Sequence, residues 1–307
     1  MNKVIVFCNN RMALPAIQIL AQHQILSGIG IPDTNTELEQ ECRHFFGASN
    51  ISIQKLEQKT LAEVTLNWLQ TTQSHYVLLM TFPWKIPASL LNTLPNKFIN
   101  FHYGLLPQMR GADPIFESIR RQFNETGITI HIVTSEIDKG PILITQKILL
   151  DKHITHGLLC TRMANLAAQM SQQLMHLLNQ TNLPDGEVQS EHEAMYYNRA
   201  NLNDVIINWQ TMDSKSIDAL IRACNPWNKG AYTSHGNWNF RIIAVTDAGQ
   251  SDTNSTPGTI SRGENNECHV HCKDNRKLNI SIIHSEEGFF EGNMLFEFGI
   301  KSGNYLN

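Results

Sequence analysis

The sequence predicts a doubly wound, mostly parallel α/β sheet followed by a small β-barrel domain. Strand-like and helix-like segments alternate up to about residue 110, which is typical of such a sheet. Residues 75–80 form an apolar run, as expected for a central parallel strand. After Asn225, turn-forming residues recur about every ten residues, a spacing typical of short strands in a small barrel.

The elements of the predicted sheet follow one another in a regular order. In the helix expected at 60–70, Leu61, Val64 and Trp68 fall on one face at helical spacing. The strands at 97–102 and 126–133 are expected because successive side chains alternate between two faces. The strands are predicted at residues 3–8, 25–31, 51–53, 75–80, 97–102 and 126–133, and the helices at 13–20, 34–46 and 60–70.

The second half of the chain predicts a domain boundary. A long helix from about residue 153 to 180 is expected to complete a first domain at residues 1–180. Residues 181–203 are polar, contain Pro-Asp-Gly, and are interpreted as a linker. A helix at 214–224 then opens a second domain at residues 204–307.

Composition limits the possible functions. The chain has 307 residues, 41% hydrophobic and 17% charged, and a net charge of -4, which is typical of a globular protein. It contains no basic run, so a nucleic-acid partner is not indicated. The N-terminus enters a strand directly and no long apolar segment appears, so a cytoplasmic protein without membrane contact is expected. The segment from Cys268 to Cys272 would direct its two cysteines and two histidines to opposite faces of a strand, so no metal site is predicted.

Three polar residues form the candidate catalytic group. Asn100 and His102 lie two residues apart at a strand end and therefore point to the same face. Asp138 follows the strand at 126–133, just before a Gly-Pro turn, where its carboxylate could reach His102. An amide donor, an imidazole and a carboxylate can together polarise a carbonyl, stabilise an oxyanion and transfer a proton.

These residues carry a resemblance to a known family. The pattern N-F-H-x-G-L-L-P-x-x-R-G at residues 100–111, followed by T-G-I-T-I-H and I-D-x-G-P-I-L between residues 126 and 143, resembles the folate-dependent formyltransferases. Motifs after residue 195 are similar to the C-terminal domain of the methionyl-tRNA formyltransferases within that family. The family's usual loop has serine where this chain has Gly104.

The resemblance implies an enzyme with a Rossmann-like catalytic domain, an OB-like second domain and 10-formyltetrahydrofolate as co-substrate. Asn100, His102 and Asp138 are then the expected catalytic residues. The loop at 81–87 is expected to offer backbone hydrogen bonds to the pterin ring, beside an apolar wall. The residues expected at the reduced folate are Phe82, Trp84, Ile86, Leu105, Leu106, Pro107 and Ile137.

The acceptor of the formyl group is the open question. The acidic stretch at 31–41 favours a small-molecule or carrier-bound primary amine over tRNA, since phosphate contacts need Lys and Arg. Asn10, Arg11 and Arg110 are the candidate acceptor contacts, and a capped turn with Arg11 in solvent is the structural alternative. The alternatives in function are methionyl-tRNA formylation, hydrolysis of formyltetrahydrofolate and a catalytically idle folate-binding protein.

Overall fold

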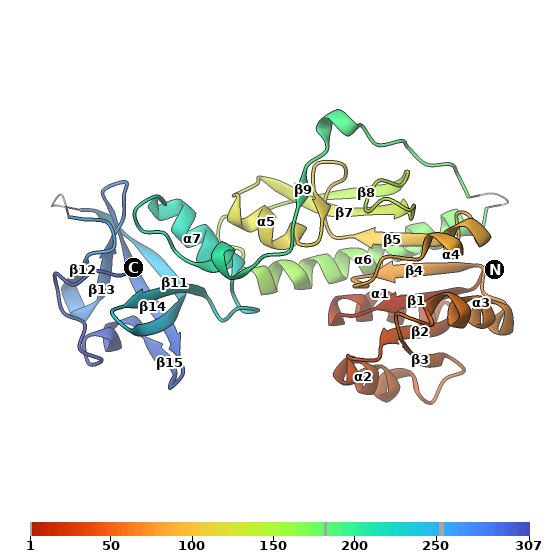
Figure 1. Ribbon diagram of the computed structural model, residues 1–307, viewed down its shortest axis with the longest axis horizontal. Coiled ribbons are helices and arrows are strands. Elements are labelled where there is room, and N and C mark those ends of the chain that lie inside the picture. The colour runs from red at the N-terminus through yellow and green to blue at the C-terminus, as the bar shows by residue number, and fades with distance from the viewer. Residues whose placement is uncertain (1, 181–182, 252–254) are drawn as a thin grey trace. The chain divides into compact units, whose positions relative to one another are not determined.

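The computed structural model describes residues 2–180, 183–251 and 255–307 (Figure 1). The chain divides into two compact units. Unit 1 comprises residues 1–114, 126–148 and 160–197, and unit 2 comprises residues 115–125, 149–159 and 198–307. This division groups residues 187–197 with unit 1, although the sequence places them in the expected linker.

Unit 1 is built on a sheet with the strand order β3-β2-β1-β4-β5-β7-β8. The pairs from β3 to β5 are parallel, and β7 pairs antiparallel with β5. This confirms the predicted mostly parallel sheet. Its strands are β1 (Val4–Cys8), β2 (Leu26–Pro32), β3 (Ser52–Leu56), β4 (Tyr76–Met80), β5 (Phe98–His102), β7 (Glu125–Ile132) and β8 (Ile142–Leu149).

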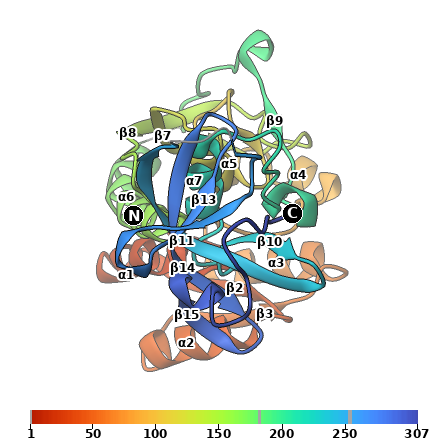
Figure 2. The same ribbon diagram turned by 90° about the vertical axis from the view of Figure 1, so that its left-hand side faces the viewer.

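Helices cover both faces of this sheet. Figure 2 shows α1 and α6 on one side and α3 and α4 on the other. On the second side, Trp68 of α3 and Leu90 of α4 are buried against Phe7 and other strand side chains. The helices that lie wholly or mostly in unit 1 are η1 (Arg11–Ala13), α1 (Leu14–Gln22), α2 (Thr36–Phe46), α3 (Leu61–Thr72), α4 (Ala88–Thr93), α6 (His156–Leu178) and the 3-10 turn η2 (Glu191–Glu193). Helix α5 (Pro114–Arg120) belongs to unit 2 except for its first residue.

Most predicted elements occur within a few residues of their expected positions, but α4, α5 and β8 were not predicted. The helices α4 and α5 are short, so neither shows a full helical repeat of apolar residues. The strand β8 is intermediate or exposed along its length, so it lacks the apolar alternation of a half-buried strand. No helix in the described ranges is both long and apolar enough to cross a membrane.

Unit 2 contains an antiparallel sheet with the strand order β10-β11-β14-β13-β12, and β15 pairs with β14. The predicted second domain of short strands is therefore confirmed as an antiparallel sheet domain, and α7 (Ser214–Ala223) matches the helix predicted at 214–224. Its elements are η3 (Leu202–Val205), α7 (Ser214–Ala223), β10 (Ala231–His235), β11 (Trp238–Gln250), β12 (Ile260–Arg262), η4 (Glu264–Asn266), β13 (Cys268–His271), β14 (Arg276–Ser285), β15 (Gly288–Glu291) and η5 (Gly292–Leu295).

Residues 187–197, which we call the strap, pack against the rest of unit 1. At one end the backbones of Glu187 and Ile142 exchange two hydrogen bonds of 2.8 Å each. At the other end β9 (Tyr196–Tyr197) pairs in parallel with β6 (Arg110–Gly111). The strap is therefore anchored both to the segment after Asp138 and to the loop after His102. Residues 181–182 of the expected linker lie outside the described residues.

Candidate active site

The polar residues of the candidate site gather at the carboxyl end of β5. The strand order reverses between β1 and β4, and ligands of open α/β sheets bind beyond the strand ends near such a switch point. Asn100 and His102 close β5, and β7 places His131 opposite Asn100 and Thr129 opposite His102. Two strands therefore bring four polar side chains to one region of the sheet.

Asp138 joins this group, as the sequence predicts. Its Oδ1 lies 3.6 Å from Nδ1 of His102 and 3.7 Å from Nε2 of His131. Its Oδ2 accepts a 2.9 Å hydrogen bond from the backbone N–H of Gly111. Burial alone would raise the pKa of Asp138, but the two imidazoles and the Gly111 N–H outweigh it and lower that pKa to about 2. The carboxylate is therefore ionised at neutral pH, and the Gly111 N–H holds one of its oxygens.

His102 is buried and faces an acceptor on each side. Its Nε2 lies 2.5 Å from the backbone oxygen of Met109, so the hydrogen-bond network assigns a proton to Nε2. Burial lowers the pKa of His102, and the Asp138 carboxylate opposes this shift without reversing it. The neutral ring therefore has a free lone pair on Nδ1, and a proton arriving there would meet the carboxylate.

His131 fixes the amide of Asn100. Nδ1 of His131 lies 2.9 Å from the backbone oxygen of Ile132 and therefore carries a proton. In the neutral ring, Nε2 is then an acceptor, and it lies 3.1 Å from Nδ2 of Asn100. The network thus directs the NH₂ group of Asn100 toward His131 and leaves its second N–H for another acceptor.

Thr129 holds the loop after His102. Its hydroxyl donates to the backbone oxygen of Gly104 at 2.8 Å and accepts from the backbone N–H of Leu106 at 3.1 Å. The hydrogen bonds of Gly111, Met109 and the strap had no signal in the sequence.

The residues expected at the folate occupy different environments. Phe82 and Trp84 are partly buried, with ring centroids 5.3 Å apart, and Phe82 also lies 5.2 Å from Phe7. Ile86 is 2% exposed and lies in the core, whereas Ile137 is 58% exposed. Loop 81–87 is thus anchored through its side chains. The wall residues Leu105, Leu106 and Pro107 are all buried.

The three candidate acceptor contacts are already engaged by the protein. Asn10 caps η1 by accepting from the backbone N–H of Met12 at 3.0 Å. Arg11 is exposed and pairs at 2.7 Å with both Glu37 and Glu41. This arrangement matches the capped-turn alternative.

Arg110 is fully buried and directs all its N–H groups into the strap. Nε and Nη2 donate to Oε1 of Gln189 at 3.0 and 2.9 Å. The remaining partners are the carboxylate of Glu191, at 2.9 and 3.1 Å, and the hydroxyl of Tyr196, at 2.9 Å. A phosphate could reach this guanidinium only by displacing these buried bonds.

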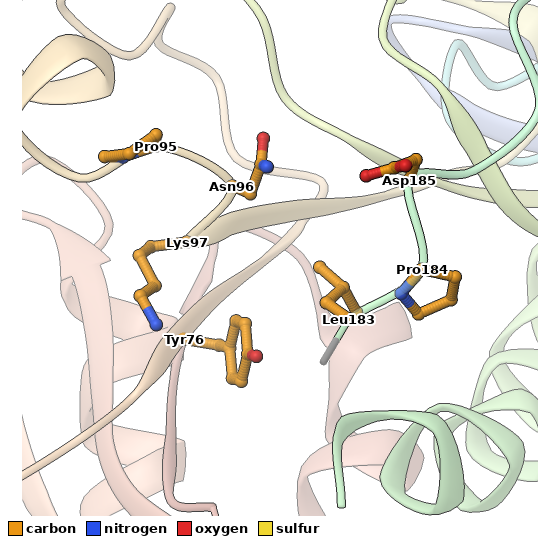
Figure 3. A pocket seen from close by; sticks show the side chains of 7 residues that line it. All are labelled: Tyr76, Pro95, Asn96, Lys97, Leu183, Pro184 and Asp185. Carbon is orange, nitrogen blue, oxygen red and sulfur yellow. The ribbon is translucent and has the colours of Figure 1, made fainter. Parts of the chain in front are cut away.

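A surface hollow elsewhere on unit 1 is distinct from this site. Figure 3 shows its lining side chains. Tyr76 opens β4 and Lys97 immediately precedes β5, so the hollow lies at the amino ends of these strands, whereas Asn100 and His102 lie toward the carboxyl end. The lining residues are Tyr76, Pro95, Asn96, Lys97, Leu183, Pro184 and Asp185.

Comparison with known proteins agrees with this geometry. Residues 18–175 match the sequence model of the formyl transferase family, and residues 201–289 match the model of the formyl transferase C-terminal domain. The chain belongs to the formyl transferase family. The folate-dependent formyltransferase family predicted from the motifs is therefore confirmed, as is an enzyme of that class.

Several relatives of the chain are methionyl-tRNA formyltransferases. The chain is 31% identical over 204 residues to that of Marinobacter nauticus, covering 66% of this chain and 64% of the relative. It is 30% identical to that of Nitrosomonas eutropha, covering 76% and 73%, and 25% identical to that of Orientia tsutsugamushi, covering 89% of each.

Solved structures share the fold. WlaRD, a sugar 3N-formyl transferase crystallised with dTDP and 5-N-formyl-THF, superposes with a TM-score of 0.69 at 18% identity, covering 91% of this formyl transferase and 97% of WlaRD. HypX from Aquifex aeolicus superposes with a TM-score of 0.68 at 12% identity, covering 98% of this chain and 49% of HypX.

Gly104 marks a departure of this formyl transferase from the usual loop. A Cβ atom at this position would lie 2.7 Å from Cβ of Pro114 and 3.0 Å from Nε2 of His102. Contacts under 3.0 Å require something to move, and Pro114 is a rigid neighbour. A serine would therefore press on the His102 ring unless the loop shifted.

Proposed function

We propose that this formyl transferase moves the formyl group of 10-formyltetrahydrofolate to the primary amine of a small-molecule or carrier-bound acceptor. The observation that carries the proposal is the convergence of Asn100, His102 and Asp138 at one strand end. Formyl transfer needs an oxyanion donor and a proton acceptor, and this group supplies both.

The residues divide the reaction between them. The acceptor amine attacks the formyl carbon, and the free N–H of Asn100 donates to the oxyanion that forms. His102 takes a proton from the attacking nitrogen at Nδ1, where Asp138 stabilises the imidazolium. The same proton then goes to the folate nitrogen as its bond to the formyl carbon breaks. The products are the N-formyl acceptor and tetrahydrofolate, with no net proton change.

The charges around the site favour a small acceptor. Arg11 is paired with two glutamates, Arg110 with Glu191, and Lys139 with Glu136 at 2.8 Å. Binding of a nucleic acid releases counterions through Lys and Arg side chains that are available to phosphates. These three cations are already neutralised by carboxylates.

Methionyl-tRNA is the second candidate acceptor. The named relatives are methionyl-tRNA formyltransferases, and one of them aligns over 89% of this chain. That observation concerns the whole chain, whereas the charge argument concerns only the surroundings of the site.

The test is a formylation assay with 10-formyltetrahydrofolate and a panel of acceptors. The panel contains charged initiator tRNA, amino-sugar nucleotides, amino acids and a carrier-bound aminoacyl group, with a reaction lacking any acceptor as control. We expect product with at least one of the small or carrier-bound amines and weak salt dependence. Salt-sensitive formylation of tRNA alone would select the second candidate. Folate consumption without acceptor would identify a hydrolase.

A further inference from the structure

The strap contributes a glutamine that links the two halves of the site. Gln189 is 8% exposed and lies outside the ranges matched by the two family models. Its Nε2 donates to the backbone oxygens of Asp138, at 2.8 Å, and Gly140, at 2.7 Å. Its Oε1 accepts the two hydrogen bonds from Arg110. Both N–H groups and the oxygen of the Gln189 side chain are therefore engaged by residues of unit 1.

The orientation of this amide follows from chemistry. A guanidinium has only donors, so it must face Oε1, and two carbonyl oxygens have only acceptors, so they must face the NH₂ group. Arg110 cannot move freely, because it is fully buried and also bound to Glu191 and Tyr196. Gln189 therefore ties the turn at residues 138–140 to a fixed point on the loop that follows His102.

The turn at Asp138 depends on outside support. Asp138 has a φ of 56°, in the left-handed region that is unfavourable for residues other than glycine. At Gly140 a Cβ would lie 1.6 Å from the backbone oxygen of Ile132, so the chain passes very close to β7 there. The hydrogen bonds from Gln189 fall on the two carbonyls that flank this strained segment.

The carboxylate of Asp138 is linked to the same anchor. Its Oδ2 is held by the N–H of Gly111, the residue after Arg110. We propose that Gln189 is a positioning residue that sets the Asp138 carboxylate against His102. The inference rests on the proposed function, in which that carboxylate stabilises the protonated His102 ring.

Two variants separate the roles of the glutamine. Gln189→Met removes all four hydrogen bonds at similar length, and Gln189→Glu keeps an acceptor for Arg110 but removes both donors. We expect each to lower kcat by about 10- to 100-fold, the size of effect that small misplacements of reacting groups produce. The KM for the folate should change by no more than about twofold, since this residue holds a group used in the transition state.

A second measurement needs no substrate. Asp138, His131 and the backbone oxygen of Met109 face the His102 ring, and the Asp138 carboxylate opposes the lowering of its pKa by burial. Displacement of the carboxylate in Gln189→Met should therefore shift the NMR titration of His102 to lower pH than in the wild type. A purely structural role would lower the melting temperature and leave this titration unchanged.

The matched control is Gln108→Met. Gln108 is exposed and joins the same loop to the strap through one 3.0 Å hydrogen bond to Glu193. It should keep wild-type kcat and wild-type titration of His102. An equal loss in this control would overturn the assignment to Gln189.

The outcomes distinguish this inference from the proposed function. Folded Gln189 variants with wild-type titration of His102 and wild-type kcat would overturn it. If Gln189→Met does not fold, wild-type kcat and wild-type titration of His102 in Gln189→Glu would also overturn the inference, because that variant lacks both donors to the turn. If the wild type formylates no acceptor but the titration shifts as expected, the proposed function fails and the positioning role stands.

Discussion

At the residue scale, one carboxylate is shared by two imidazoles and one backbone N–H. Asp138 lies within 3.7 Å of both His102 and His131, and each ring has its other nitrogen at a backbone oxygen. This network determines which nitrogen of each ring carries the proton. It leaves Asn100 with a donor and His102 with a lone pair, which are the two functions that formyl transfer needs.

Single substitutions at these residues should remove most of the activity. We expect Asn100→Ala, His102→Ala and Asp138→Ala each to lower kcat by about 10²- to 10³-fold, the usual effect of losing an oxyanion donor or its equivalent. Steady-state formyl transfer is the measurement, with circular dichroism to check folding. Asn92→Ala, at an exposed position of α4, is the matched control and should be silent. More than a tenth of the activity in all three variants would rule out this assignment.

At the element scale, the two-residue strands β6 and β9 bring the strap against the site. Gly111 has a φ of 110°, and a Cβ on it would lie 2.0 Å from the backbone oxygen of Tyr197. The pairing therefore requires glycine both for its backbone conformation and for the close approach of the two chains. The same glycine supplies the N–H that binds Asp138.

Substitution of Gly111 should destabilise the protein by more than the strain of its positive φ alone would. We expect Gly111→Ala to lower the free energy of unfolding by more than about 2 kcal/mol, because the steric conflict adds to the strain of a positive φ. Gly303→Ala is the control, with a φ of 90° and no heavy atom within 4 Å of the added Cβ. It should cost about 1 kcal/mol. Calorimetry measures both variants. Equal losses of unfolding free energy in Gly111→Ala and Gly303→Ala would mean that the strap moves away from the added Cβ without cost.

At the scale of the whole molecule, the free energy of unfolding should depend on pH through His156. This histidine lies apart in the sequence from the candidate catalytic residues. His156 begins α6, and its ring lies 6.1 Å from that of Trp227 within unit 2. Burial lowers the pKa of His156 to about 4. The unfolded chain therefore takes up this proton first as the pH falls. The stabilisation is complete above pH of about 6.5 and is lost progressively toward pH of about 4.

Replacing this histidine should flatten that dependence. Between pH 7 and pH 4.5, His156→Phe should lose less stability than the wild type, by about 2 kcal/mol, since one unit of pKa shift corresponds to about 1.4 kcal/mol. Urea unfolding at the two pH values measures the difference. His23→Gln, at an exposed position after α1, should keep the wild-type dependence. An unchanged dependence in His156→Phe would contradict the burial of this ring.

The sequence alone determined the features that depend on local repeats. Alternation along β5 places Asn100 and His102 on one face, and helical spacing in α3 places Trp68 in the core. The alternation of strands with helices determined the mostly parallel sheet, and regular turns determined the short antiparallel strands of the second domain. Such periodicities arise from the geometry of one element and are therefore visible in the chain itself.

Only the tertiary structure decided which residues meet across loops. The partners of Arg110 come from the strap, about 80 residues later in the chain. This residue looked like a free cation in the sequence, and Gln189 looked like part of a linker. A hydrogen bond between distant segments leaves no repeat in either one, because its energy depends on where the folded backbone brings the two groups.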